Sequence, residues 1–178
     1  MRCKNKSGQF YLIAAIVIIS LVIGFTGIAN YSKKTNSERI NGIRDEMQIE
    51  TAKIVEYGVE NYNYIERLAK INELLKNVSE IYSNYSGVEE FYYVLGDTSS
   101  VAISAYMKDF PETANIDGTE TIWDKSLGDN YKIIYHTPTS STLTIKMNNI
   151  DYAFELTSGL NLYFIISKGD YVATNKNF

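Results

Sequence analysis

Side chains that could carry out chemistry are few in this chain of 178 residues. His136 is the single histidine and Cys3 the single cysteine. One histidine cannot supply a multi-histidine metal site, and on a predicted strand a solvent-facing or hydrogen-bonded role explains it better than catalysis does. One cysteine, close to the N-terminus, excludes both a disulfide framework and a cysteine-based zinc site.

Acidic side chains gather in a polar stretch, Lys108–Asn130, which the sequence predicts to be a long surface loop. Its acidic residues include Glu112, Asp117, Glu120, Asp124 and Asp129. Their spacing is not that of an EF-hand, so a solvated loop explains them better than a calcium site does. Trp123, the only tryptophan, is expected to anchor this loop to the core or to form a contact point.

The chain lacks the common catalytic and cofactor motifs. It has no phosphate-binding P-loop, no glycine-rich dinucleotide-binding turn and no Gly-x-Ser-x-Gly elbow. From residue 87 onward it carries six basic and twelve acidic side chains. An acidic surface repels phosphate backbones, so nucleic-acid binding is disfavoured. We expect a protein that is not an enzyme and that needs no cofactor and no metal.

Three Asn-x-Ser triplets could accept an N-linked glycan if this part of the chain lies outside the cell. They begin at Asn30, Asn77 and Asn84. Such triplets also arise by chance, so the sequence offers them as candidates only.

The longest uncharged stretch lies near the N-terminus, and its apolar part covers residues 9–31, QFYLIAAIVIISLVIGFTGIANY. As a helix rising about 1.5 Å per residue, it would extend roughly 35 Å, enough to cross a bilayer core of about 30 Å. We therefore predict a transmembrane helix over residues 9–32, in contact with membrane lipid. A basic leader, residues 1–8, precedes it, and its positive charges favour an inside N-terminus and an outside C-terminal domain.

Three processing outcomes fit this N-terminus. The segment could remain an uncut signal anchor, or a signal peptidase could cut before Asn30, after the small residues Gly27 and Ala29. The apolar run is longer than the usual apolar region of about 7–15 residues in a cleaved signal, which argues against the second outcome. In the third, the leader is cut between Gly8 and Gln9 and the helix stays on the mature chain.

The third outcome carries a family resemblance. A basic leader ending in Gly8, followed by Gln9-Phe10 and a long Ile/Ala/Val-rich helix, resembles the class III signal of type IV pilin-like proteins. Gln9 at the first mature position is similar to archaeal pilins and archaellins. The resemblance implies a prepilin peptidase that cuts between Gly8 and Gln9. It also implies that the retained helix first holds the subunit in the membrane and later packs with other pilin subunits in a filament.

The residues that the resemblance assigns to assembly lie in the first part of the apolar segment and at its small residues. They are Phe10, Tyr11, Leu12, Ile13, Ala14, Ala15, Gly24 and Gly27. Small side chains allow helices to approach closely. Ile13 departs from the family, which commonly has a glutamate at this fifth mature position. The departure favours a minor pilin or pilin-like protein over a major subunit.

Residues 33–86 form a charged region with an apolar face. Apolar residues recur every three or four positions, as on one side of a helix. A capping-box pattern, Thr35 to Glu38, precedes them, and Gly87 suits the end of a helix. We predict one long helix or two between about Asn36 and Tyr85, with Gly58 as a bend or break.

From residue 87 onward short alternating or continuous apolar runs predict strands. The predicted strands are Phe91–Leu95, Val101–Met107, Tyr131–Thr137, Thr142–Met147, Asp151–Thr157, Leu160–Ser167 and Tyr171–Thr174. Short turns between them favour an antiparallel meander.

Together these patterns predict an α+β fold. A long N-terminal membrane-spanning or assembly helix would continue into an amphipathic helix packed on a C-terminal antiparallel β-sheet domain, residues 87–178. The leading function hypothesis is a structural subunit of a type IV pilus-like surface filament that serves adhesion or surface contact. The alternatives are a signal-anchored surface binding domain that does not polymerise and a pseudopilin of a secretion system.

Overall fold

The computed structural model describes residues 18–19, 37–147 and 149–175. The predicted leader, the Gly8–Gln9 cleavage position, the assembly residues from Phe10 to Gly27 and the Asn30 sequon lie outside these ranges. The chain divides into two compact units, residues 1–39 and residues 40–178. All contacts below lie within the second unit.

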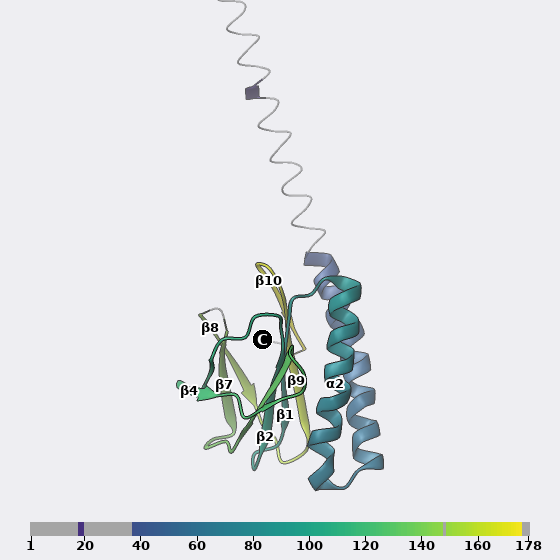
Figure 1. Cartoon of the computed structure of the whole chain (residues 1–178), viewed down its shortest axis with the longest axis vertical. Helices are drawn as coiled ribbons and strands as arrows, with labels where there is room; N and C mark the ends of the chain where they lie inside the picture. The colour runs from purple at the N-terminus through teal and green to yellow at the C-terminus, as the bar shows by residue number, and fades with distance from the viewer. Residues whose placement is uncertain (1–17, 20–36, 148, 176–178) are drawn as a thin grey trace, which may run out of the picture. The chain divides into compact units, whose positions relative to one another are not determined.

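The helical region folds back on itself as a hairpin. Residues 37–61 are helical, and a second helix, α2 (Tyr64–Ser86), follows after a break of two residues. Asn63 is the N-cap of α2. Its backbone is extended rather than helical, and its side chain accepts a hydrogen bond from the Glu66 amide at 3.1 Å. The two helices lie side by side (Figure 1).

A glycine and a distant lysine complete the end of α2. Gly87 adopts the left-handed conformation, with φ of 66°, and its amide donates to the Ser83 carbonyl at 2.9 Å. The Lys168 Nζ atom donates to the Ser86 carbonyl at 2.8 Å. The last turn of α2 has no basic residue of its own. Lys168 therefore supplies the positive charge that stabilises the C-terminus of a helix.

Two antiparallel sheets make up the rest of the unit. The six-stranded sheet has the order β10 (Tyr171–Thr174), β9 (Asn161–Lys168), β1 (Glu90–Gly96), β2 (Val101–Tyr106), β6 (Tyr131–His136) and β5 (Lys125–Ser126). The four-stranded sheet has the order β4 (Thr119–Ile122), β3 (Thr113–Ile116), β7 (Thr142–Met147) and β8 (Ile150–Glu155).

The six-stranded sheet is the middle of three layers, between the helices and the smaller sheet (Figure 1). Successive side chains of a strand point to opposite faces. In β1, Phe91, Tyr93 and Leu95 pack with the helices, whereas Val94 packs with the smaller sheet. Both faces are therefore buried, which accounts for the continuous apolar runs of the central strands.

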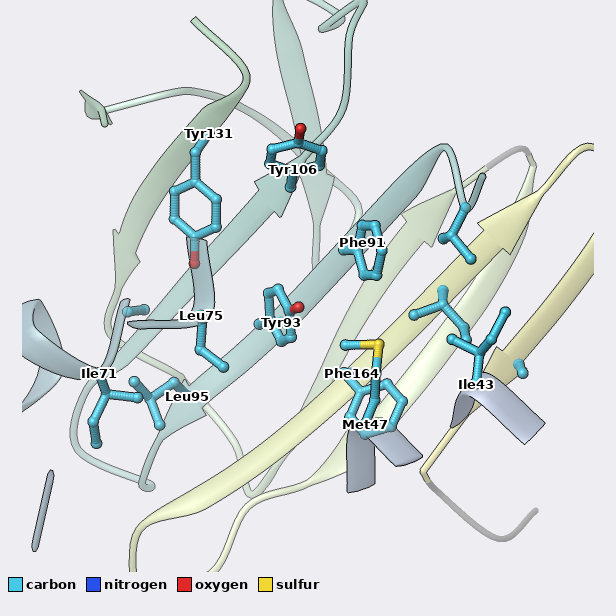
Figure 2. Close-up of a cluster of buried hydrophobic side chains, with 14 of the residues drawn as sticks. Ile43, Met47, Ile71, Leu75, Phe91, Tyr93, Leu95, Tyr106, Tyr131 and Phe164 are labelled. Carbon is cyan, nitrogen blue, oxygen red and sulfur yellow. The ribbon is translucent and has the colours of Figure 1, made fainter. Parts of the chain in front are cut away.

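The helix-facing core is rich in aromatic side chains. Phe91, Tyr93 and Phe164 come from the sheet and meet Met47 and Leu75 from the two helices (Figure 2). Phe91 and Tyr106 lie edge to face, with ring centroids 5.9 Å apart. Aromatic rings in this edge-to-face arrangement attract each other, and their size fills the space between the helices and the sheet.

The structure is of the α+β type, but the predicted arrangement, a long N-terminal helix that continues into an amphipathic helix packed on one antiparallel sheet, is wrong. The described helical region is a hairpin of two helices, the strands form two antiparallel sheets, and no long apolar helix occurs in the described ranges. None of the helices described there is long and apolar enough to cross a membrane. The apolar periodicity runs through both helices because both face the same sheet, whereas the cap at Asn63 decides where the chain reverses.

Two further predictions fail in the sheets. The stretch Lys108–Asn130 is not a long loop, because it forms β3, β4 and β5. The strands do not form one meander, because β1 pairs with β9, from Glu90 opposite Ser167 to Gly96 opposite Asn161. The short β3–β4 hairpin has few large apolar residues, and its pairing with β7, with Asn115 opposite Lys146 and Ile116 opposite Ile145, is a tertiary contact that a local pattern does not reveal.

Candidate functional site

The two sequons within the described ranges lie on α2, and their asparagines are exposed. Their serines are not. Ser79 is fully buried and its hydroxyl donates to the Leu75 carbonyl at 2.8 Å. Ser86 is also buried and donates to the Tyr82 carbonyl at 2.5 Å. In the folded hairpin neither serine hydroxyl is accessible, so a glycan at Asn77 or Asn84 would have to be attached before α2 forms.

His136 has one charged neighbour. Its Nε2 atom lies 3.5 Å from Asp117 Oδ2, and both side chains are half-buried. Asp117 also accepts a hydrogen bond from the Thr144 amide at 2.8 Å, in a turn where its φ is 51°. The pair joins the end of β6 to the β3–β4 turn, so its contacts are those of a structural link between the sheets.

The acidic residues predicted to share a loop do not converge. Asp124 accepts a hydrogen bond from the Tyr135 amide at 2.8 Å, while Asp117 lies at the opposite end of the β3–β4 hairpin. Within the described ranges no group of three or more histidine, cysteine or acidic side chains could hold a metal ion.

The outer face of the helical hairpin carries large apolar side chains. Ile81 and Tyr85 are 65% and 74% exposed and lie one turn apart on α2. On the helix 37–61, Ile49, Tyr57 and Val59 are about half exposed. Ile81 and Tyr85 are neighbours on one side of α2, and together they form a small exposed apolar pair.

A cavity of about 640 Å³ is lined by residues of both sheets, and we call it the inter-sheet cavity. Its apolar lining includes Ile103, Met107, Ile145 and Met147, and Thr113, Asn115 and Asn149 contribute polar groups. Its size is in the range of ligand-binding pockets in proteins.

Two aromatic residues form one wall of the inter-sheet cavity. Phe110 and Trp123 lie edge to face, with ring centroids 5.4 Å apart and planes at 82°. The Trp123 indole donates to the Pro111 carbonyl at 3.1 Å. The Lys132 ammonium lies 4.6 Å from the centre of the Phe110 ring. These contacts hold the two rings against each other.

A carboxylate without a donor lies in the same cavity. Glu90 Oε2 is buried, and no described residue forms a hydrogen bond with it. On the same strand, the Tyr92 hydroxyl contacts the Met107 sulfur at 3.8 Å. Burial raises the pKa of Tyr92 well above its ordinary value, and the negative charge of Glu90 raises it further. The acidic lining residues are Glu90, Asp109 and Glu120, and the only basic one is Lys146.

The sequence did not reveal this cavity. Glu90 begins a strand and reads as a solvated side chain, and Phe110 and Trp123 fall in the stretch that was interpreted as a loop. The signal that could have found the site is the pair of large aromatic residues within that polar stretch, because a solvated loop has no use for them.

Comparison with known proteins yielded no match, whether with family models, with curated proteins or with solved structures.

Proposed function

We propose that this chain is a pilin-like structural subunit of a type IV pilus-like surface filament, of the minor or pilin-like kind. The observation that carries the proposal is the N-terminal sequence, with its basic leader, Gly8-Gln9-Phe10 and the uncharged stretch of residues 9–31. A prepilin peptidase would cut after Gly8. The apolar segment would then anchor the chain in lipid and later pack with neighbouring subunits, while residues 40–178 serve surface contact outside the cell.

The exposed apolar face of the hairpin supports an assembly role. In a filament, subunits repeat at close spacing. An apolar surface outside the anchor can then be buried against a neighbouring subunit, whereas in a monomer it stays in contact with water. Ile81 and Tyr85 lie on that face and are not needed for the core, because most of each side chain is exposed.

The first test determines the mature N-terminus by mass spectrometry of the protein from its native membrane. A chain that starts at Gln9 is the expected result. An intact Met1 or a start at Asn30 would contradict the proposal. Replacing Gly8 by leucine should leave the leader uncut, while the neighbouring Ser7→Ala change should leave processing unaffected.

The second test examines assembly. Filaments sheared from cells and pelleted should contain the protein. The double variant Ile81→Lys/Tyr85→Lys should fold but be reduced at least several-fold in the sheared fraction. Ile122→Lys is the matched control, because Ile122 is 73% exposed and lies on β4, away from the hairpin. Equal amounts of all three proteins in the filaments would show that the hairpin face has no part in assembly.

A further inference from the structure

We propose that two copies of this chain exchange their C-terminal hairpins, β9–β10, when the turn that precedes β9 opens, and that the Asn161 side chain holds this turn closed. Asn161 thereby sets the balance between a monomer and a hairpin-exchanged dimer. This inference does not depend on filament assembly.

The β9–β10 hairpin is closed by its own contacts. All four residues of β10 pair with β9. Asn175 extends this pairing, because its side chain accepts a hydrogen bond from the Phe164 amide at 2.8 Å and donates to the Leu162 carbonyl at 3.0 Å. The hairpin therefore moves as one unit when it leaves or joins the rest of the fold.

The rest of the fold depends on this hairpin. All seven residues of β1 pair with β9, and Phe164, Ile166 and Ala173 of the hairpin belong to the helix-facing core. Lys168 adds its hydrogen bond to the Ser86 carbonyl at the end of α2. A second copy presents the same strand, the same core and the same helix end, so the hairpin of one copy forms identical contacts in the other.

The link between β8 and β9 can open without exposing the core. It crosses from the four-stranded sheet to the six-stranded sheet. Leu156 is buried and its amide donates to the Ser141 carbonyl at 2.7 Å, so the smaller sheet holds the chain up to this residue. The next three residues, Thr157, Ser158 and Gly159, are exposed. Straightening them therefore moves no apolar side chain into water.

The Asn161 side chain closes this link with hydrogen bonds. Asn161 Oδ1 accepts from the Thr157 hydroxyl at 2.9 Å, and Asn161 Nδ2 donates to the Gly159 carbonyl at 2.7 Å. Both partners lie in the link, so these two bonds require that the link be folded back. Asn161 Nδ2 also donates to the Gly96 carbonyl at 3.0 Å, at the end of β1. An exchanged hairpin keeps that third bond, with the other copy.

The equilibrium between monomer and dimer therefore depends on the link. The other contacts of the hairpin are the same in both forms, and two links open in each dimer. Each hydrogen bond within the link favours the monomer twice over. Short hinge segments of this kind are where sequence changes promote domain swapping.

Disulfide cross-linking between β1 of one chain and β9 of another tests the exchange. Both chains carry Cys3→Ser, one carries Glu90→Cys, and a differently tagged one carries Ser167→Cys. Glu90 and Ser167 are opposite each other, and the Cα atoms of opposite residues in antiparallel strands lie about 4.5–5.5 Å apart, within reach of a disulfide. The two full-length chains are unfolded in urea, refolded together in a neutral detergent and oxidised. A disulfide between the two tagged chains is the expected result.

A second pair of chains measures disulfides that form by random encounter. One chain carries Ser167→Cys and the other Val172→Cys, again with Cys3→Ser in both. Ser167 and Val172 are opposite each other within the hairpin, so an exchanged hairpin carries both positions along and does not bring them together between chains. Equal cross-linking in the two pairs would overturn the proposal.

Three variants separate the effect of the link from a loss of stability. Asn161→Ala in both chains should raise the cross-linked fraction at least tenfold at equal protein concentration, and Thr157→Val, a milder change at an exposed position, should raise it several-fold. Asn175→Ala is the matched control, because it removes two similar bonds that lie inside the hairpin and are lost equally from monomer and dimer. Its cross-linked fraction should equal that of the unaltered link. An unchanged fraction in both link variants, or an equal rise in all three, would overturn the proposal.

Discussion

Gly58 of the helix 37–61 lies directly against Ile71 of α2, so closely that a Cβ atom on Gly58 would come within 2.5 Å of the Ile71 Cγ1 atom. Gly58 is buried and Ile71 is fully buried. The glycine that the sequence presents as a bend or break is therefore a point of close approach between two helices. The break between the two helices begins four residues later. Because Gly58 has no side chain, the two helices can approach each other closely at this point.

Replacing Gly58 by alanine should destabilise the protein. Alanine favours a helix over glycine by up to about 1 kcal/mol, but overpacking a filled core costs about 1–3 kcal/mol, and the fully buried Ile71 side chain would have to shift to make room. We expect a net loss of about 1–2 kcal/mol in the free energy of unfolding, measured by urea titration of the full chain in detergent.

Gly42 provides the control for this prediction. It is an exposed glycine of the same helix, and no atom lies within 4 Å of a Cβ added there. Gly42→Ala should therefore stabilise the chain by up to about 1 kcal/mol. A gain of similar size at Gly58 would mean that the two helices do not pack as described.

The buried hydroxyls of Ser79 and Tyr93 form an asymmetric pair, 2.7 Å apart. Because Ser79 donates its only proton to the Leu75 carbonyl, Tyr93 must donate to Ser79. Ser79→Ala leaves the Tyr93 hydroxyl buried without an acceptor and should cost about 1–3 kcal/mol. Tyr93→Phe leaves Ser79 bonded to the backbone and should cost about 0.5–1.5 kcal/mol. Chemical unfolding of both variants gives the comparison, and a larger loss for Tyr93→Phe would reverse this assignment of donor and acceptor.

Alkaline pH should unfold the protein cooperatively. Burial raises the pKa of Tyr93 and of Tyr131 well above the ordinary value near 10. Above pH 10 the unfolded chain therefore releases protons that the folded chain retains, so stability is complete below pH 10 and falls as the pH rises. Each buried tyrosine contributes a slope of about 1.4 kcal/mol per pH unit.

Variants separate the tyrosines in this experiment. Tyr93→Phe and Tyr131→Phe should each reduce the alkaline slope by one proton, measured as unfolding free energy between pH 10 and 12. Tyr85→Phe is the control, because 74% of the Tyr85 side chain is exposed. A slope that does not change in either buried variant would show that these hydroxyls reach water in the folded state.

Lys168 should stabilise the end of α2 through its charge. Lys168→Met keeps most of the aliphatic stem but removes the donor to the Ser86 carbonyl and the positive charge at the helix terminus. We expect a loss of about 1 kcal/mol in thermal or urea unfolding. The difference between wild type and variant should shrink in high salt, because the charge contribution is screened. Lys146→Met, at an exposed strand position away from α2, should show no such salt-dependent difference.

Local patterns predicted individual elements well. β7 has the predicted bounds Thr142–Met147, because one of its faces is buried and the other is not, which gives strict alternation. The partner of β1 was not predictable, because its pairing with β9 joins residues more than 60 positions apart and no local pattern encodes it. Glu90 was missed for the same reason, since its isolation depends on strands and loops from several parts of the chain.

The pairing of β1 with β9 also sets the order in which the protein can mature. β1 can pair with β2 as soon as that hairpin is made, but its other edge remains bare until residues 161–168 are available. Since contacts this distant in sequence form slowly, a nascent chain exposes an apolar strand edge from the completion of β1 at Gly96 until β9 is made. A chain shortened before Asn161 would keep that edge and should aggregate. Secretion in an unfolded state, or a chaperone that covers β1, would protect the chain until its C-terminal hairpin arrives.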